Sequence, residues 1–196
     1  MLLGDSKTKE NLMRAFAGES QARNRYDMAA SVAKKEGFFI IEKAFIYTAD
    51  QERAHAKLYY DKLKSFAGNN VNISEAGYPI DIYDQTLPLL KAASKNEYEE
   101  WGEVYKDFAK VANEEGFTDI ATIFSQVAEI EKIHGDRFAR FYEEIESGTL
   151  FRKSEDVQWM CTNCGHVHTG KEAPGVCSTC SHPRGYFLLF EHSLFE

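Results

Sequence analysis

The sequence predicts a mainly α protein, in which a bundle of four long helices is followed by a small domain stabilised by a metal ion. Two observations support this prediction. Apolar residues recur at three- to four-residue spacing, with charged residues between them, in long stretches of residues 6–147. All four cysteines form two Cys-x-x-Cys pairs between residues 161 and 180. We therefore expect one domain over residues 1–148 and a second over residues 154–196.

Composition limits the class of partner. The 196 residues are 43% hydrophobic and 28% charged, as in ordinary soluble domains. The formal net charge of −8 argues against nucleic acid, because a phosphate-binding surface needs clustered Lys and Arg. No apolar run approaches the ~18 residues of a membrane span, and the first residues do not resemble a secretory signal. We expect a cytoplasmic protein without a membrane or nucleic-acid partner.

The first two helices are expected to form a hairpin. One helix should cover residues 6–36, with Ser6 or Thr8 as its N-cap. Gly37 is the expected stop, because glycine readily adopts the left-handed backbone conformation that ends many helices. The second helix should then begin at Phe38 and run to about residue 66.

A second hairpin is expected after a crossover. Residues 68–81 are rich in turn formers, and helical patterns follow over residues 86–115 and 118–147, with Gly116 between them. Two hairpins of long helices joined by one extended crossover form the plan of a ferritin-like four-helix bundle.

An internal repeat supports this plan. Glu36-Gly37-Phe38 returns later in the chain as Glu115-Gly116-Phe117, and the same shift relates Glu52-Arg-Ala-His55 to Glu131-Lys-Ile-His134. Each Glu-x-x-His places a carboxylate and an imidazole one helical turn apart on the same face, where both can bind one metal ion.

Helical rise identifies partners for these motifs, because each residue advances the helix by about 1.5 Å. The interval from Gly37 to Glu52 equals the interval from Gly116 to Glu131. Glu19 lies about as far before Gly37, and Glu97 and Glu100 about as far before Gly116, to within roughly one turn. The candidate ligands at this common height are Glu19, Glu52, His55, Glu97, Glu100, Glu131 and His134.

Carboxylates with imidazoles suit iron, manganese or zinc, and the set approaches that of di-iron carboxylate bundles. Each glutamate alone would more often be a solvated surface residue, but chance is a poor explanation for all seven at one height. Tyr26 and Tyr105 could donate hydrogen bonds to the site carboxylates, or could simply pack in the core.

The cysteines predict a second metal site. Cys161, Cys164, Cys177 and Cys180 can supply four thiolates to one tetrahedral ion, either iron or zinc. A domain of ~40 residues is too small to be stable on its core alone, so the metal must contribute to folding. Structural zinc is one interpretation; a redox-active iron that supplies electrons to the bundle is the other.

Together these motifs resemble the rubrerythrin family over essentially the whole chain. That family joins a ferritin-like di-iron bundle to a rubredoxin-like domain with one iron held by four cysteines. Trp159 and His182-Pro183 also resemble the family, whereas Ser178 and Ser181 replace the usual Pro and the usual Gly or Ala. Its motif is met here by Glu19, Glu52/His55, Glu97/Glu100 and Glu131/His134, and its thiolates by the four cysteines above.

The resemblance implies a peroxidase that reduces hydrogen peroxide to water, with electrons passing from the four-thiolate iron to the di-iron site. It also implies that one iron exchanges Glu100 for His55 on reduction. Zinc could substitute for iron. The electron source would be an external rubredoxin or NAD(P)H-linked reductase, since no Gly-x-Gly-x-x-Gly occurs here.

Assembly and alternatives complete the expectations. From His134 to Ser147 the last helix extends about 20 Å. The distance between the two metal centres of one chain would therefore be too long for efficient electron transfer, and a head-to-tail homodimer is expected. The alternatives are a ferroxidase or iron-storage protein, which needs no four-thiolate domain, and a non-catalytic, zinc-stabilised helical adaptor.

Overall fold

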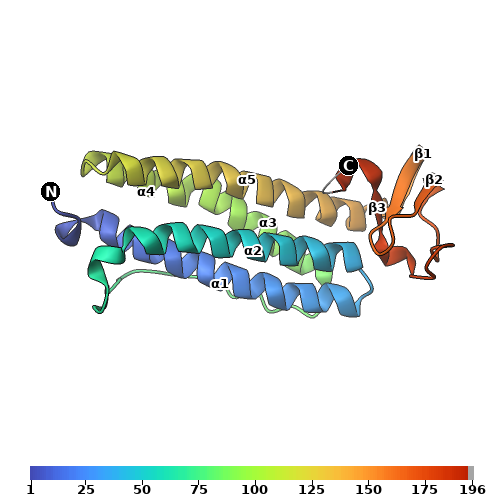
Figure 1. The fold of residues 1–196 in the computed structure, drawn as a ribbon, viewed down its shortest axis with the longest axis horizontal. Coiled ribbons are helices and arrows are strands. Elements are labelled where there is room, and N and C mark those ends of the chain that lie inside the picture. Colours follow the sequence, from blue (N-terminus) through green and yellow to red (C-terminus); the bar gives the residue numbers. More distant parts are fainter. Residues whose placement is uncertain (194–196) are drawn as a thin grey trace.

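The computed structural model describes residues 1–193 and contains an elongated helical bundle with a small β domain at one end (Figure 1). Its two hairpins confirm the predicted mainly α class. The long thread between the hairpins runs alongside α1 (Figure 1). The bundle helices are α1 (Lys7–Lys35), α2 (Phe39–Lys62), α3 (Thr86–Glu99), α4 (Tyr105–Glu114) and α5 (Thr118–Glu146), with short 3₁₀ turns at Leu3–Asp5 and Lys64–Phe66.

The third predicted helix, expected to be continuous over residues 86–115, is interrupted. A π-helical segment, η3 (Glu100–Val104), separates α3 from α4. The repeat explains why: Tyr105 follows Glu97 by eight residues, whereas Tyr26 follows Glu19 by only seven. A π turn accommodates one additional residue within a helix. The insertion therefore lets Tyr105 keep a position equivalent to that of Tyr26.

The predicted turn glycines and N-cap Ser6 set the helix ends that they mark, whereas α2 ends at Lys62, short of the predicted residue 66, and a 3₁₀ turn follows. Gly37 and Gly116 have φ of +80° and +88°, in the left-handed region where a Cβ would be strained. Ser6 caps α1 by accepting a hydrogen bond from the backbone N–H of Lys9 at 3.1 Å. Each hairpin therefore reverses at a glycine.

The glutamate before each turn glycine has a second role. Glu36 accepts a hydrogen bond from the backbone N–H of Thr86 at 2.6 Å, at the start of α3. Glu115 accepts from the backbone N–H groups of Lys7 and Thr8 at 2.9 and 2.8 Å, at the start of α1. A helix leaves its first N–H groups without intrahelical partners. Each hairpin therefore caps the first helix of the other.

The bundle core has two aromatic layers. One contains Tyr26, Phe45 and Phe138, with ring centroids 5.0–5.9 Å apart. The other contains Tyr59 and Phe124, 5.1 Å apart, together with Tyr105. The predicted ligands lie between these layers, at the middle of the bundle, where Glu52 and Glu131 are at most 1% exposed.

The C-terminal domain is a three-stranded antiparallel sheet in the order β2-β1-β3. Its strands are β1 (Arg152–Cys161), β2 (Val167–Glu172) and β3 (Phe187–Leu189). Trp159 is fully buried among Cys161, Cys177 and Phe187, and its indole N–H donates to the carbonyl of Gly170 at 2.9 Å. The core of this domain is thus small and includes two of the cysteines.

The small domain packs on the α1–α2 turn (Figure 1). The rings of Phe39 and Tyr186 stack with centroids 4.2 Å apart, and Lys43 Nζ donates to the carbonyl of Thr162 at 3.1 Å. Gly185 approaches the turn so closely that an added Cβ would lie 1.7 Å from the carbonyl oxygen of Gly37. Only glycine fits at position 185 in this arrangement.

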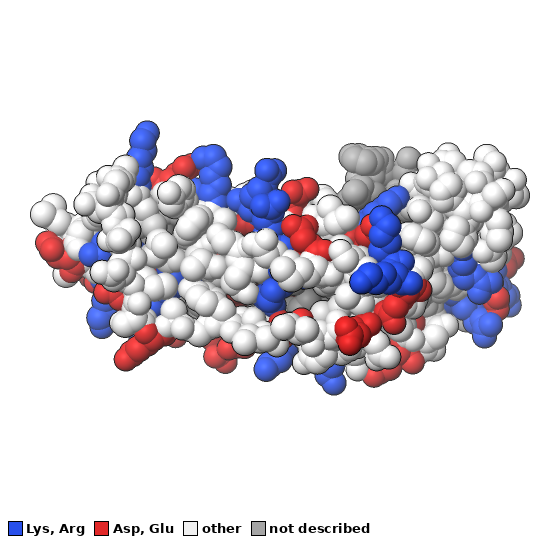
Figure 2. All heavy atoms as spheres, turned by 90° about the horizontal axis from the view of Figure 1, so that it is seen from below, with Lys and Arg blue, Asp and Glu red and all other residues white. Residues whose placement is uncertain are grey.

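Charged side chains of both signs lie on the surface. On the face shown in Figure 2, acidic and basic side chains alternate along the molecule rather than separating into one basic stretch. Among the described helices, none is both long and apolar enough to span a membrane.

Candidate di-metal and four-thiolate centres

Two carboxylates occupy the centre of the bundle site. Glu52 Oε1 lies 2.9 Å from His134 Nδ1, and Glu52 Oε2 lies 3.3 Å from His55 Nδ1. Glu131 Oε2 lies 2.8 Å from His134 Nδ1, and Glu131 Oε1 lies 3.0 Å from His55 Nδ1. Each carboxylate thus presents one oxygen to each imidazole, as expected for carboxylates that bridge two cations.

Two further carboxylates complete the two halves. Glu19 Oε2 lies 3.7 Å from His55 Nδ1, and Glu97 Oε2 lies 3.6 Å from His134 Nδ1. Within each half, the candidate ligand atoms lie within 4.8 Å of one another. Both halves include the central pair, Glu52 and Glu131. The first half adds Glu19 and His55, and the second half adds Glu97 and His134.

The polar atoms of this site fit a pair of metal ions. Buried polar atoms are nearly always hydrogen-bonded. Among residues 1–193, however, eight buried atoms of these six side chains have no hydrogen-bond partner: Glu19 Oε2, both oxygens of Glu52 and of Glu131, Glu97 Oε2, and Nδ1 of His55 and of His134. All eight face the same small region. Carboxylate oxygens and imidazole nitrogens are the donors that iron, manganese and zinc accept.

The electrostatics also call for positive charge at the centre. Burial favours the neutral form of an imidazole, but the carboxylates of Glu131 and Glu52 outweigh it and raise the pKa of His134 to about 11. His55 behaves alike, with its pKa raised to about 10 by Glu19 and Glu52. Burial raises the pKa of Glu19 to about 8. The charge of the nearby Glu52 carboxylate adds to this rise, and bound cations would offset the repulsion between the two carboxylates.

Glu100 does not join either half. It begins η3 and lines a cavity between α1 and the α3–α4 helices, beside the di-metal site. Burial, followed by the charges of Glu97 and Glu19, raises its pKa well above the ordinary value. The structure therefore brings together six of the seven predicted bundle ligands and places Glu100 next to them, on the cavity side.

The two tyrosines make crossed hydrogen bonds. The Tyr26 hydroxyl donates to Glu97 Oε1, and the Tyr105 hydroxyl donates to Glu19 Oε1. Each tyrosine thus contacts a carboxylate from the other hairpin. Both hydroxyls are buried, which raises the pKa of each well above 10 and keeps it a donor. The predicted hydrogen bonding and aromatic packing both occur.

His134 also has polar contacts that were not predicted, made by Gln51 and, through it, by Arg137. His134 Nε2 lies 3.1 Å from Gln51 Oε1, which also accepts from Arg137 at 3.2 Å. Arg137 donates a second hydrogen bond to Thr48 Oγ1 at 2.7 Å. The sequence did contain one indication of these contacts, because Arg137 follows His134 by about one helical turn and so lies on the same face of the helix. A partner on the ring nitrogen that faces away from a metal fixes the orientation of the imidazole.

The four cysteines converge as predicted. Cys161 Sγ and Cys180 Sγ are 3.7 Å apart, as are Cys164 Sγ and Cys177 Sγ. Four thiolates at about 2.3 Å from one tetrahedral ion would be separated by about 3.8 Å. The backbone N–H of His182 lowers the pKa of the Cys180 thiol to about 6, which favours the thiolate that a metal needs.

The two serines that depart from the family pattern lie in these knuckles. Gly165 follows the second cysteine with φ +77°, and Ser181 follows the fourth with φ +60°. Their N–H groups donate to the carbonyls of Cys161 and Cys177 at 2.8 and 2.9 Å. Ser181 thus adopts the left-handed conformation usually reserved for glycine, and Ser178 instead contacts His166 at 3.2 Å.

Fold and sites together define a class: a ferritin-like carboxylate bundle that carries a rubredoxin-like four-thiolate domain in the same chain. Comparison with known families agrees. The rubrerythrin model matches residues 10–145, and the model of the rubrerythrin rubredoxin-like domain matches residues 159–188. The chain belongs to the rubrerythrin family. It accordingly has a di-iron carboxylate site and a four-cysteine, rubredoxin-like site.

Individual relatives cover nearly the whole chain. Rubrerythrin of Porphyromonas gingivalis is 45% identical over 93% of this chain and 89% of its own length. Rubrerythrin of Nitratidesulfovibrio vulgaris is 42% identical over 95% and 96%. A structure of partially reduced nigerythrin matches with a TM-score of 0.63 at 28% identity, over 95% of this chain and 90% of its own. A bacterioferritin of Desulfovibrio desulfuricans shares the fold, with a TM-score of 0.64 at 20% identity over 73% and 82%.

Proposed function

We propose that this chain is a peroxidase that reduces hydrogen peroxide to two water molecules, using two electrons and two protons. The observation that carries this proposal is the pairing, in one chain, of a bridged carboxylate–imidazole site with a four-thiolate site. A storage protein needs only the first, and a zinc-stabilised adaptor needs only the second. Two bound irons would supply the two electrons that cleave the O–O bond.

The protein side chains supply positions and protons. Glu52 and Glu131, which face both imidazoles, would hold both ions, and Glu19 and Glu97 would each bind one of them. Tyr105 lines the cavity, and its hydroxyl donates a hydrogen bond to Glu19 Oε1 of the site. A proton entering from the cavity can therefore reach the site through this hydroxyl.

His55 is the imidazole we expect to leave its iron, in exchange for Glu100. The repeat supports this asymmetry. The polar side chains linked to His134 through its Nε2 atom are Gln51, Arg137 and Thr48. The shift that relates the two Glu-x-x-His motifs places the apolar Ile130, Val127 and Leu58 at the corresponding positions around His55. His134 is thus anchored by Gln51, whereas among residues 1–193 no equivalent side chain donates to or accepts from His55, which leaves His55 the freer ring.

Electron entry would occur between subunits. The small domain touches α2 at Phe39, and Glu52 lies about 20 Å further along the same helix. The face formed by α2 and α5 exposes Tyr47 by 40%, Leu58 by 45% and Ile133 by 57%, beside the Gln51 that contacts His134. We infer that this apolar face receives the rubredoxin-like domain of a second copy in a head-to-tail dimer, and that a rubredoxin or NAD(P)H-linked reductase supplies the electrons.

Rapid mixing tests the activity. The anaerobically reduced protein should contain about three iron ions per chain, and hydrogen peroxide should promptly oxidise both centres. Cys177→Ala should abolish turnover with a reductase yet leave oxidation of the bundle iron intact, and Ser178→Ala, next along the chain, is the matched control. A four-thiolate iron that stays reduced after peroxide addition would contradict the proposal, and assembly into a large cage would favour storage.

Subunit mixing tests the dimer. Glu131→Ala removes the bundle site and Cys177→Ala removes the thiolate site, so each variant alone should be inactive. If electrons cross between subunits, mixed dimers should regain turnover, because each contains one complete pair of centres. Absence of any recovery in verified mixed dimers would mean that transfer occurs within one chain.

A further inference from the structure

A large cavity lies beside the di-metal site. It has a volume of about 1000 Å³ and is bounded by α1, by the α3–α4 helices and by residues 74–79 of the crossover. The crossover is held against α1, because the Tyr78 hydroxyl donates to the carbonyl of Arg14 at 3.0 Å and Arg14 Nη2 donates to the carbonyl of Ser74 at 2.9 Å. The crossover therefore forms one wall of the cavity, opposite the α3–α4 helices.

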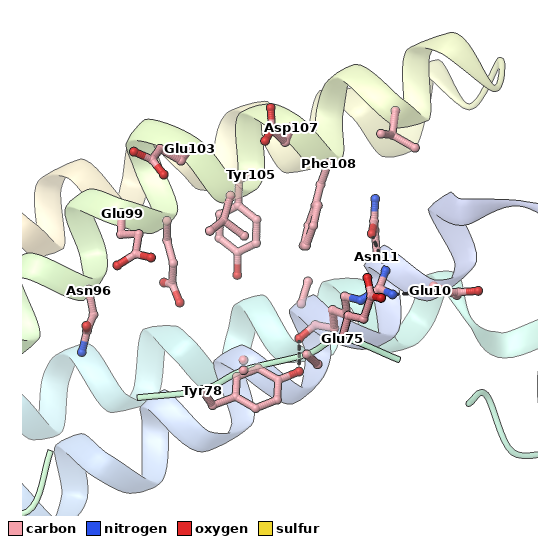
Figure 3. A pocket seen from close by; sticks show the side chains of 18 of the residues that line it. Glu10, Asn11, Glu75, Tyr78, Asn96, Glu99, Glu103, Tyr105, Asp107 and Phe108 are labelled. Atoms are coloured by element: carbon pink, nitrogen blue, oxygen red, sulfur yellow. Dashed lines mark hydrogen bonds and ion pairs between the residues drawn. The ribbon is translucent and has the colours of Figure 1, made fainter. Parts of the chain in front are cut away.

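This cavity borders the metal site through Tyr105 and Glu100. Tyr105 and Phe108 project from α4 into it, and Tyr78 faces them from the crossover (Figure 3). Tyr105 contacts Glu19, and Glu100 also lines the cavity. A molecule in the cavity can thus approach the side of the site that carries the proton-donating tyrosine.

The size exceeds what hydrogen peroxide requires. A water molecule occupies about 30 Å³ and hydrogen peroxide roughly twice as much, whereas cavities of roughly 300–1,000 Å³ hold drug-sized organic ligands. One part of the inner wall is apolar or small, with Ala15 and Gly18 buried and Phe108 half-buried, whereas Asn11 and Glu100 add polar groups beside it. The apolar part suits a hydrocarbon group better than a second peroxide.

The rim of the cavity carries more acidic than basic side chains. Among the described residues, four exposed acidic side chains line it, against two exposed lysines, and the only arginine there, Arg14, is already paired with Glu10 at 2.9 Å. Like charges repel within about a Debye length. The exposed acidic residues are Glu75, Glu99, Glu103 and Asp107, and the lysines are Lys7 and Lys95.

From these features we infer that the cavity binds the organic group of neutral organic hydroperoxides, which the chain reduces alongside hydrogen peroxide. The reaction is ROOH + 2 e⁻ + 2 H⁺ → ROH + H₂O, in which the O–O bond breaks and the alcohol leaves through the cavity. This inference rests on the proposed peroxidase function for its electrons. It adds the substrate class and the neutral-over-anionic preference.

Binding of an unreactive product provides a test that does not require turnover. Calorimetric titration of the iron-loaded protein with 2-phenyl-2-propanol, the alcohol formed from cumene hydroperoxide, should show saturable binding. Gly18→Leu should weaken that binding at least tenfold, because a Cβ at position 18 points to within 3.7 Å of the Tyr78 ring, inside the cavity. Gly102→Leu is the matched control, since a Cβ there meets nothing within 4 Å.

Turnover adds two comparisons. In Gly18→Leu, kcat/KM for cumene hydroperoxide should fall at least tenfold more than kcat/KM for hydrogen peroxide. A fatty-acid hydroperoxide should be reduced less efficiently than its methyl ester, with a difference that narrows at high salt. If Gly18→Leu loses iron, Gly18→Ala, whose added atom makes only ordinary contact, should give a smaller shift of the same kind.

The outcomes are separable. Absence of saturable alcohol binding, or equal binding by the wild type and Gly18→Leu, would overturn the inference. Equal losses for both peroxides would do the same, because they would indicate general damage to the site. Alcohol binding without reduction of any peroxide would instead contradict the proposed function.

Discussion

Replacing Glu115 by alanine should destabilise the bundle measurably, although this residue is far from the metal site. Its carboxylate accepts hydrogen bonds from the Lys7 and Thr8 backbone N–H groups, at 2.9 and 2.8 Å, and from the Thr8 hydroxyl, at 2.6 Å. The substitution leaves all three donors at the start of α1 without this partner, and Thr8 is fully buried.

The magnitude follows from the geometry. Loss of a helix cap costs about 0.5–2 kcal/mol, and loss of a negative charge at a helix N-terminus adds about 0.3–1 kcal/mol. Because Glu115 is half-buried and water can partly replace it, we expect about 2 kcal/mol in total. For a chain of this length that corresponds to a fall in Tm of about 4–8 °C.

Thermal unfolding of iron-loaded protein, followed by circular dichroism at matched iron content, measures the effect. Glu114→Ala is the control, because Glu114 is exposed and adjacent. Glu36→Ala, which removes a single backbone hydrogen bond, should give a smaller fall. A Glu115→Ala protein with the same Tm as Glu114→Ala would refute the reasoning.

The pH dependence of this cap has a definite sign. Partial burial opposes ionisation of Glu115, but the hydrogen bonds from Thr8 and Lys7 outweigh it and lower its pKa below the ordinary 4.5. The stabilisation is therefore fully present above pH 4.5 and is lost as pH falls through the lowered pKa. The difference in Tm between wild type and Glu115→Ala should be constant near neutral pH and shrink in acid.

Three further predictions concern the domain contact and the metal site. Gly185→Ala would place a Cβ 1.7 Å from the Gly37 carbonyl, so the small domain must move; X-ray scattering should show a larger radius of gyration with an unchanged four-thiolate spectrum, and an identical profile would contradict this. Tyr105→Phe leaves a buried oxygen of Glu19 without its hydrogen-bond donor, at a cost of about 1–3 kcal/mol in stability. Oxidation of the bundle iron by peroxide, followed by stopped-flow absorption, should be slower in Tyr105→Phe than in Tyr26→Phe. Equal rates in the two variants would exclude proton entry through Tyr105. Burial raises the pKa of Glu19 to about 8, so its contribution to the stability of the metal-free bundle is full below pH 4.5 and is lost as pH rises through 8. Thermal unfolding scans should show this loss for the metal-free protein and no loss for the iron-loaded protein. A metal-free bundle that becomes more stable over this pH range would contradict the prediction.

Helical regularity made much of the site predictable. The rise per residue is nearly constant, so distances counted from Gly37 and Gly116 placed Glu19, Glu97 and the two Glu-x-x-His motifs at one height. The four cysteines were predictable for a similar reason, because short knuckles fix their spacing locally. These features depend on local geometry, which a sequence pattern records directly.

Contacts between hairpins were less accessible. The hydrogen bonds of Gln51 with His134 and of Glu115 with Thr8 join residues 83 and 107 positions apart, and no periodicity reports them. The π segment was hidden for another reason. The sequence indicates it only through the eight-residue interval between Glu97 and Tyr105, which is seen to be one residue too long only when the two halves of the repeat are aligned.

The crossed tyrosines bear on how the protein acquires iron during synthesis. When the ribosome has released only α1 and α2, the nascent chain holds Glu19, Glu52 and His55, but neither the second bridging carboxylate nor the hydroxyl that orients Glu19. Tyr26 likewise still lacks its acceptor. The emerging hairpin is therefore a poor iron ligand. Tight capture must await docking of the second hairpin, which keeps reactive iron away from a half-made chain.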